Sequence, residues 1–329
     1  MSNLKFVLFA LPLLFALNVN AQSSVVLEEV VVTAQKKEEN LQDTPIAITA
    51  ITASTIDDLD IANVVDLAGM SPNVHIINTP SNNTAATIAI RGGSTTNPAI
   101  TWEPTVGMYL DGVYLGKGQG SIFDVVDLER VEILRGPQGT LYGRNTLGGA
   151  INLISKKPSG EGLSTKVTLG NYGLRQSQLI ADYEIGENIF TKVVLNNKKR
   201  GGYVNVEGSP YQPAQGVVPN TVTDHLELNT IDSKGIKFTV AYEGDSSSFN
   251  FSYDRTDQEN VPPFAQLVYA IPNWSSAFGM GASAATGGLQ VAPIELFQSA
   301  DRQSVAHINL DTSETSEVEG TSLTFTQDT

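Results

Sequence analysis

The chain has 329 residues, and its 35 Asp and Glu residues against 20 Lys and Arg residues give a formal net charge of −15. This excess of negative charge argues against a nucleic-acid partner, because attraction to phosphates needs clustered positive charge. Cysteine is absent, which excludes disulfides and thiolate metal sites but is compatible with an oxidising compartment.

The first 21 residues, MSNLKFVLFALPLLFALNVNA, have the pattern of a secretory signal peptide. Lys5 precedes an apolar run from Phe6 to Leu17, and the segment ends in the small residue Ala21. The run is shorter than the roughly 20 residues that a membrane-spanning helix needs, and it lacks the cap and the period of a buried amphipathic helix. We therefore expect residues 1–21 to direct export. No later segment is long and apolar enough for a spanning helix, so a membrane could be crossed only by a barrel of strands.

Residues 22–44 combine a short β-branched run with a charged stretch. The run is VVVT at 30–33, and residues 36–40 follow it with the sequence KKEEN. An extended segment of this kind can add a strand to the edge of another protein's sheet, with the charged stretch as a flexible tether. The same pattern also fits an edge strand of the following domain, and the residues alone leave both interpretations open.

Residues 45–158 mix short strands with short helices. Five segments are β-like and are bounded by Gly, Pro, Asn or Asp, namely IAITAI, ATIAIRG, TVGMYLDGVYL, RVEILRGP and GAINLIS. Apolar residues recur from Ile56 to Leu67 before a Gly-Met-Ser-Pro ending, which predicts one or two short helices. We expect an α+β domain here.

From about residue 162 the pattern changes to strands alone. In LSTKVTLG, residues Leu163, Val167 and Leu169 alternate with polar residues, and IKFTVAYEG and SSFNFSYDR repeat this period of two. Such alternation occurs in soluble sandwiches and in membrane barrels. Short turns that alternate with long polar connections at 201–225 and 257–300, and aromatic residues near strand ends, favour the barrel.

The order and spacing of four motifs resemble the TonB-dependent outer-membrane receptor family of Gram-negative bacteria. The motifs are EEVVVTA at 28–34, IRGGS at 90–94, YLDGVYLG at 109–116 and RVEILRGPQGTLYGRNTLGGAINLISKKP at 130–158. The resemblance implies a signal peptide (1–21), a TonB box with a flexible tether (22–44), an α+β plug domain (45–158) and the N-terminal part of an antiparallel transmembrane β-barrel (159–329). The last piece would hold the first seven or so strands, whereas barrels of the family close at 22 strands.

The resemblance also assigns roles to residues within the plug and before it. The contact strand for the TonB energy-transducing complex would comprise Glu29, Val30, Val31, Val32, Thr33 and Ala34. Polar contacts between plug and barrel are assigned to Arg91, Arg135 and Arg144, since a guanidinium can hold a carboxylate bidentately; without the motifs, these would be ordinary surface charges. Close packing in the lumen would explain the glycines at 136, 139, 143, 148 and 149.

The resemblance implies import of a scarce nutrient by TonB-driven rearrangement of the plug. Ligand contacts are expected in turns that face outward, at Asn97, Trp102, Lys117 and Gln119, although any of these could be a plain loop residue. Iron-siderophore chelates, haem, cobalamin and oligosaccharides all fit the architecture, and iron chelates are favoured by the family alone. The other partner would be outer-membrane lipid.

Other classes of function are less well supported by the residues. We expect no enzyme, because no G-x-S-x-G elbow occurs and GVYLGKG at 112–118 lacks the Ser or Thr of a phosphate-binding loop. His75, His225 and His307 are scattered, so neither a metal site nor a cofactor is expected. A secreted or surface β-rich carbohydrate-binding protein remains the main alternative, and a signalling receptor would usually carry a further domain before residue 28.

The length departs from the family pattern. About seven strands are predicted after residue 162, and an open barrel would expose unpaired backbone groups to lipid. The final residues, EGTSLTFTQDT, also lack the terminal aromatic residue common in such barrels. We therefore expect the sequence to be an N-terminal fragment of a longer receptor.

Overall fold

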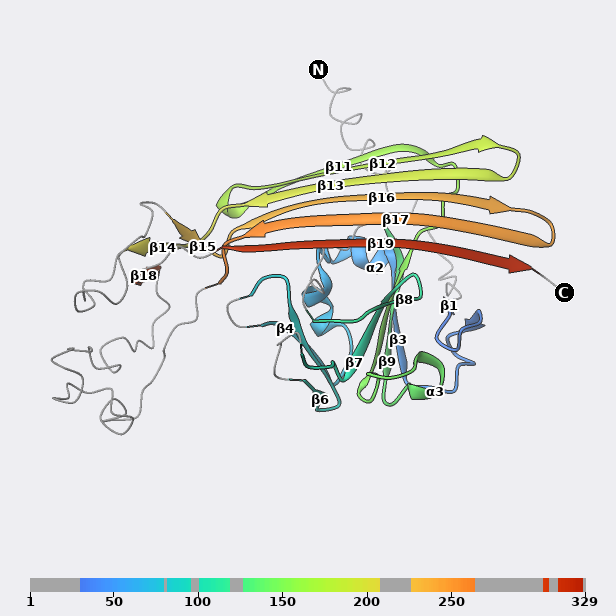
Figure 1. Cartoon of the computed structure of the whole chain (residues 1–329), viewed down its shortest axis with the longest axis horizontal. Coiled ribbons are helices and arrows are strands. Elements are labelled where there is room, and N and C mark those ends of the chain that lie inside the picture. Colours follow the sequence, from blue (N-terminus) through green and yellow to red (C-terminus); the bar gives the residue numbers. More distant parts are fainter. Residues whose placement is uncertain are drawn as a thin grey trace, which may run out of the picture.

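The structure is a computed structural model that describes residues 30–79, 82–95, 101–118, 127–207, 226–263, 304–307 and 313–327. Two layers make up the fold. A curved six-stranded sheet, called the wall below, lies across a smaller α+β domain formed by residues up to Ser155, called the N-terminal domain (Figure 1). Glu29, Asn97, Gln119 and the predicted signal peptide lie outside the described residues.

The N-terminal domain is built on a mixed five-stranded sheet in the order β3-β9-β10-β7-β8. Its strands are β3 (Ile48–Thr52), β7 (Val106–Leu110), β8 (Val113–Leu115), β9 (Leu128–Arg135) and β10 (Gly149–Ser155). The central strand β10 pairs parallel with β7 and antiparallel with β9. The strand β3 therefore forms one edge of the sheet and pairs with β9 alone among the described strands.

Two short helices and a second small sheet cover one face of this sheet, and a third short helix, which carries Tyr142, packs against the other face. The helical elements are α2 (Ala53–Asp58), η1 (Val64–Gly69) and α3 (Gly139–Tyr142), and the second sheet has β4 (Val74–Asn78), β5 (Ala86–Ile90) and β6 (Gly93–Ser94). At the start of η1, Asn63 and Asp66 cap each other's backbone N–H groups in a capping box. Leu67, Ile76, Ile133 and Ile151 form the core and are at most 2% exposed. The prediction of one or two short helices in this region is thus confirmed, with two present, α2 and η1.

The wall consists of six antiparallel strands in sequence order. They are β11 (Gly162–Gly170), β12 (Leu174–Gly186), β13 (Ile189–Arg200), β16 (Ile231–Glu243), β17 (Ser247–Asn260) and β19 (Glu314–Gln327). Among the described residues, β11 and β19 pair on one side only and so form the two edges. None of the helices described in the structure is long and apolar enough to cross a membrane.

The wall turns its polar face towards the N-terminal domain. Along β13, Lys192, Asn196 and Lys198 are buried, whereas Leu195 between them is 40% exposed. On the opposite face, the apolar side chains at the wall edges are the most exposed, with Leu169 75% exposed. A soluble sandwich would bury this apolar face. The predicted alternation with a period of two is therefore confirmed. The polar face lies on the inside, as in a membrane barrel.

The two ends of the wall differ. Short turns join β12 to β13 and β16 to β17 at one end, the short-turn end, while the connections 201–230 and 261–313 leave the other, the long-connection end. The small sheet of β14 (Val204–Glu207), β15 (Glu227–Leu228) and β18 (Val305–His307) extends beyond the long-connection end (Figure 1). At the short-turn end, Tyr242 pairs with Phe249, which pairs with Phe325, on the apolar face. Such aromatic rows mark the interface of a membrane with water.

Candidate functional site: the docked N-terminal strand and the interface with the wall

Residues 30–41 form a small hairpin that packs onto the N-terminal domain. The strand β1 (Val31–Val32) pairs antiparallel with β2 (Glu39–Asn40), and the amide of Leu41 donates to the carbonyl of Val30 at 2.9 Å. Val32 is 1% exposed, whereas Val31 is 41% exposed. The stretch expected to be a flexible tether is thus turned back against β1, because an extended strand gains partners for its backbone groups by pairing.

A buried carboxylate holds the hairpin in place. Glu132, fully buried on β9, accepts hydrogen bonds through Oε1 from the amide of Thr33 at 2.7 Å and from its hydroxyl at 3.2 Å. Arg130 Nε donates to the same oxygen at 2.9 Å, and a second guanidinium nitrogen donates to Thr33 Oγ1 at 3.3 Å. A buried carboxylate is tolerated here because charged and neutral donors satisfy it. Since β9 alternates faces, Val131 and Ile133 fill the core while Glu132 points towards the hairpin.

Aromatic residues complete the docking surface for β1. The Tyr142 hydroxyl donates to the carbonyl of Ala34 at 3.0 Å and accepts from Asn152 Nδ2 at 2.7 Å. Burial raises the pKa of the Tyr142 phenol, and the nearby Glu132 carboxylate raises it further, while the hydrogen bond from Asn152 lowers it. Lys36 Nζ lies 4.4 Å from the centre of the Tyr142 ring, a cation–π distance. Glu132, Tyr142 and Asn152 were not predicted as site residues.

The wall is joined to the N-terminal domain through a buried lysine. Lys192 Nζ on β13 lies 3.2 Å from Asp127 Oδ2 and 3.4 Å from Asp182 Oδ2, and all three side chains are at most 8% exposed. It also donates to the carbonyls of Lys156 and Lys157 at 3.1 and 3.0 Å. These contacts fix the chain that leaves β10 against β12 and β13. Burial raises the pKa of the Asp127 carboxyl, and Lys192 opposes the shift only in part.

Two further contacts lie towards the other edge of the wall. Lys237 on β16 pairs with Asp111 at 2.5 Å and contacts Ser155 Oγ, so it ties the β7–β8 turn to β10. At the long-connection end, the Glu314 carboxylate accepts from the amides of Asn83 at 2.7 Å and Thr84 at 3.3 Å, and from the Thr84 hydroxyl. These contacts join the β4–β5 turn to the first residue of β19.

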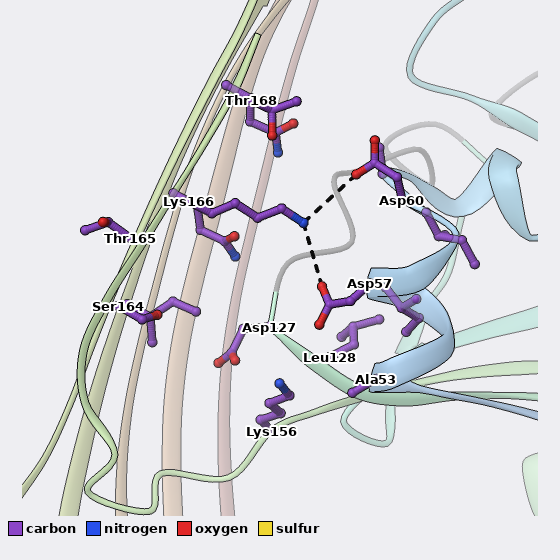
Figure 2. A pocket seen from close by; sticks show the side chains of 16 residues that line it. Ala53, Asp57, Asp60, Asp127, Leu128, Lys156, Ser164, Thr165, Lys166 and Thr168 are labelled. Carbon is purple, nitrogen blue, oxygen red and sulfur yellow. Dashed lines mark ion pairs between the residues drawn. The ribbon is translucent and has the colours of Figure 1, made fainter. Parts of the chain in front are cut away.

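A cavity of about 230 Å³ separates α2 from strands β11 and β12 (Figure 2). Lys166 reaches across it from β11, with Nζ 3.7 Å from Asp57 and 4.0 Å from Asp60. Figure 2 shows the lysine directed between the two carboxylates, with Asp127 and Lys156 at the other side of the cavity. The three paired side chains are more than half exposed, so solvent screens these ion pairs.

The predicted polar contacts of three arginines with the wall are not seen among the described residues. No hydrogen bond or ion pair joins Arg91, Arg135 or Arg144 to the wall within the described residues, and the contacts to the wall come instead from Asp111, Asp127 and other groups above. Arg135 Nε is buried, and no described residue accepts a hydrogen bond from it. The structure thus connects the two layers through residues that the sequence motifs did not single out, and the proposed role of the three arginines stays a prediction.

Among the predicted ligand residues, two are described. Trp102 is 58% exposed, and Lys117 Nζ lies 3.4 Å from Glu103 Oε1. Glu103 also accepts a hydrogen bond from Asn145, which lowers its pKa. The structure brings Lys117 and Glu103 together at an exposed surface.

Close packing explains only some of the glycines in the 130–158 motif. Gly149 has φ of +152°, and a Cβ there would lie 2.2 Å from the Leu134 carbonyl oxygen, so no other residue fits. By contrast, nothing lies within 4 Å of the position that a Cβ on Gly139 would occupy.

The comparisons with known proteins agree with this geometry. The family model of the TonB-dependent receptor plug domain matches residues 40–150. The pesticin receptor of Yersinia pestis is 34% identical over 141 residues, which cover 42% of this chain and 20% of that protein. The catecholate siderophore receptor Fiu of Escherichia coli O157:H7 is 31% identical over 241 residues, which cover 71% of this chain and 27% of that protein.

A solved structure shows the same fold. The open form of the ferric-catecholate import receptor Fiu from E. coli K12 aligns with a TM-score of 0.61 at 21% identity, over 87% of this chain and 37% of that chain. The chain thus spans between 20% and 37% of the length of these relatives. With a plug domain matched by its family model and antiparallel strands that align with those of such receptors, the chain belongs to the TonB-dependent receptor family.

Proposed function

We propose that the protein is an outer-membrane receptor that binds a scarce nutrient and imports it into the periplasm by TonB-driven rearrangement of the plug domain, which is the N-terminal domain above. The observation that carries the proposal is the strand β1, docked by Thr33 and Ala34 onto the plug domain near the short-turn end of the wall (Figure 1). A strand held there by only a few contacts can leave the plug domain and pair with the edge of another protein's sheet.

Transfer of this strand from the plug domain to TonB would use the backbone of residues 29–34. Strand addition needs free N–H and C=O groups along one edge, and one edge of β1 is now paired with β2. Traction by TonB on this segment would break the bonds from Thr33 to Glu132 and from Tyr142 to Ala34. Because Glu132 and Tyr142 belong to the plug domain, the pull reaches β9 and α3 directly.

The cargo is proposed as a ferric siderophore. Curated relatives are named as a pesticin receptor and a catecholate siderophore receptor, and the latter aligns over 71% of this chain. Trp102 offers an exposed aromatic face for stacking, and Lys117 offers a charge for an anionic chelate. Asn97 and Gln119 would add hydrogen bonds. No catalytic role is proposed.

The orientation in the membrane follows from the wall. The apolar face would contact outer-membrane lipid, the short-turn end with β1 would face the periplasm, and the long-connection end would face the outside. Residues 1–21 would direct export before cleavage.

The test is uptake by Val32→Pro, made in the full reading frame and expressed in cells that lack other iron receptors. Proline removes a backbone donor and disfavours strand pairing, whereas the matched control Val32→Ile keeps a β-branched side chain. With an iron-55 tris-catecholate as the probe, we expect Val32→Pro to bind normally but to take up no more iron than a strain without TonB. Normal uptake by Val32→Pro would refute the proposal that this strand pairs with TonB.

A further inference from the structure

Three neighbouring cavities lie between the plug domain and strands β16, β17 and β19. Their volumes are about 300, 100 and 530 Å³. The first begins beside Lys117, and the last ends beside Lys36 and Thr33 of the docked hairpin. Leu115 borders both the first and the second, and Lys237 borders both the second and the third. The three cavities therefore form one series, called the β16–β19 passage, from the exposed Lys117 surface to the docked strand.

Small side chains on the wall leave this space open. Ser322 of β19 and Ser252 of β17 each border two of the cavities, and Gly235 and Gly320 lie beside them. On the other half of the wall, the long side chains of β11 and β13 instead reach the plug domain, as Lys192 and Lys166 do. On the half with β16, β17 and β19, the contacts of Lys237 and Glu314 with the plug domain thus leave cavities between the two layers.

Two buried polar atoms that border the passage have no hydrogen-bond partner among the residues that the structure describes. Ser233 is 2% exposed and borders the middle cavity, and its hydroxyl makes no hydrogen bond. Asn152 is 7% exposed and borders the largest cavity, and its side-chain oxygen is likewise unpaired. Unpaired buried polar groups cost free energy, so their presence along one passage points to a ligand that binds them.

The charge of the largest cavity indicates which kind of ligand. Six cationic side chains border it, namely Lys36, Lys37, Arg130, Lys156, Lys157 and Lys237. Four acidic side chains border it, namely Glu38, Asp111, Glu129 and Glu243. The difference of 6 − 4 gives a local charge of +2 within a chain of net charge −15. A passage of this charge, with hydroxyl-bearing walls, favours an anionic ligand rich in hydrogen-bonding groups.

We propose that the β16–β19 passage is the route by which an anionic, hydroxyl-rich ligand crosses the wall lumen. Ser233, Asn152 and Lys237 contact the ligand in transit, and the pair of Lys237 with Asp111 closes the passage between its narrow and its wide parts. The proposal rests on the transport function above and adds the route. The cavity between α2 and β11 in Figure 2 is the competing route, which Lys166 bridges.

The first experiment fills each route with one large side chain in the full reading frame. Ser322→Trp fills the β16–β19 passage, Gln178→Trp fills the cavity of Figure 2, and Leu323→Trp places the same ring on the apolar outer face. Surface abundance and binding of an iron-55 tris-catecholate to de-energised cells show that each variant is folded. We expect at least a tenfold lower uptake in Ser322→Trp at unchanged binding, with both controls near wild type. Normal uptake by a folded Ser322→Trp, or a loss in Gln178→Trp alone, overturns the route.

The second experiment needs no known cargo, so failure of the proposed function is distinguishable from failure of the route. The sequence has no cysteine, and Ser322→Cys and Gln178→Cys therefore introduce a unique thiol in this part of the protein. A membrane-impermeant anionic sulfonate thiol reagent and a cationic trimethylammonium one are added to cells with and without TonB. We expect TonB to speed anionic labelling of Ser322→Cys at least fivefold, to leave Gln178→Cys unchanged, and the anionic reagent to react faster than the cationic one. Equal labelling with and without TonB contradicts the route, and faster reaction of the cationic reagent contradicts the ligand class.

Discussion

Replacing Tyr142 by Phe should loosen the docked strand without disturbing the rest of the plug domain. The substitution removes one oxygen, which donates to the Ala34 carbonyl at 3.0 Å and accepts from Asn152 at 2.7 Å. Asn152 keeps its second acceptor, Glu132, at 3.4 Å. The loss therefore amounts to one hydrogen bond between strand and plug domain, worth about 1 kcal/mol. An energy of this size changes the ratio of docked to undocked strand by a factor of about five.

A spin label at residue 31 can measure this ratio. Val31 is 41% exposed, so Val31→Cys accepts a label without displacing the buried Val32. We expect the mobile component of the spectrum to rise about fivefold in Tyr142→Phe relative to the labelled parent. Tyr172→Phe, at the long-connection end, serves as the control and should leave the spectrum unchanged. An unchanged spectrum in Tyr142→Phe would show that the hydrogen bond from Tyr142 to Ala34 does not stabilise the docked strand.

The same contact should respond to alkaline pH. Because burial raises the pKa of Tyr142 above its usual value of 10.0 in the docked state, ionisation opposes docking. The sign follows directly: the hydrogen bond to Ala34 is fully present below pH 10 and is lost as the pH rises through the raised pKa. The mobile component should therefore increase above pH 10 in the parent, and Tyr142→Phe should remove this contribution. A parent spectrum that is constant through that range would contradict the assignment.

Three other substitutions test the packing of the two layers. Lys192→Met leaves the carboxylates of Asp127 and Asp182 buried without their cationic partner, so the free energy of unfolding in urea should fall by about 3–5 kcal/mol, and adding Asp127→Asn should recover part of the loss. If the double variant has the same free energy of unfolding as Lys192→Met alone, the loss is not an effect of unpaired charge. Gly149→Ala should reduce the yield of folded protein, whereas Gly139→Ala should not, and equal yields would contradict the close approach. Glu314→Gln should speed hydrogen exchange at the Asn83 amide, measured by mass spectrometry, because a charge-assisted acceptor is lost; unchanged exchange would show that the contact does not protect it.

The strands and their faces could be predicted from the sequence because they depend on local alternation. Leu163, Val167 and Leu169 alternate with polar residues and lie on the exposed apolar face of β11. The helices between residues 53 and 69 likewise follow from local apolar spacing and from caps such as Asn63. These features need only the period of each element, which the order of residues contains.

The contacts between the layers could not be predicted in this way. Lys192 and Asp127 are 65 positions apart, and their pairing depends on how the plug domain sits against the wall. The glycine- and arginine-rich motif drew attention to Arg135 and Arg144, yet within the described residues the ion pairs to the wall come from other side chains. A signal for Glu132 was present, since an acidic residue between Val131 and Ile133 in a central strand needs a partner. That partner, Thr33, is 99 residues away in sequence.

The most direct test of the central claim is disulfide cross-linking of the docked strand to TonB in living cells. Val31→Cys in the full reading frame is combined with a TonB that carries one cysteine in the edge strand that would receive β1, and Trp102→Cys, an exposed position of the plug domain outside residues 29–34, is the control. The account predicts a cross-linked product with Val31→Cys, more of it in Tyr142→Phe, and none with Trp102→Cys. Absence of the product at residue 31 in cells that contain both proteins would contradict the assignment of residues 29–34 as the strand that TonB takes up.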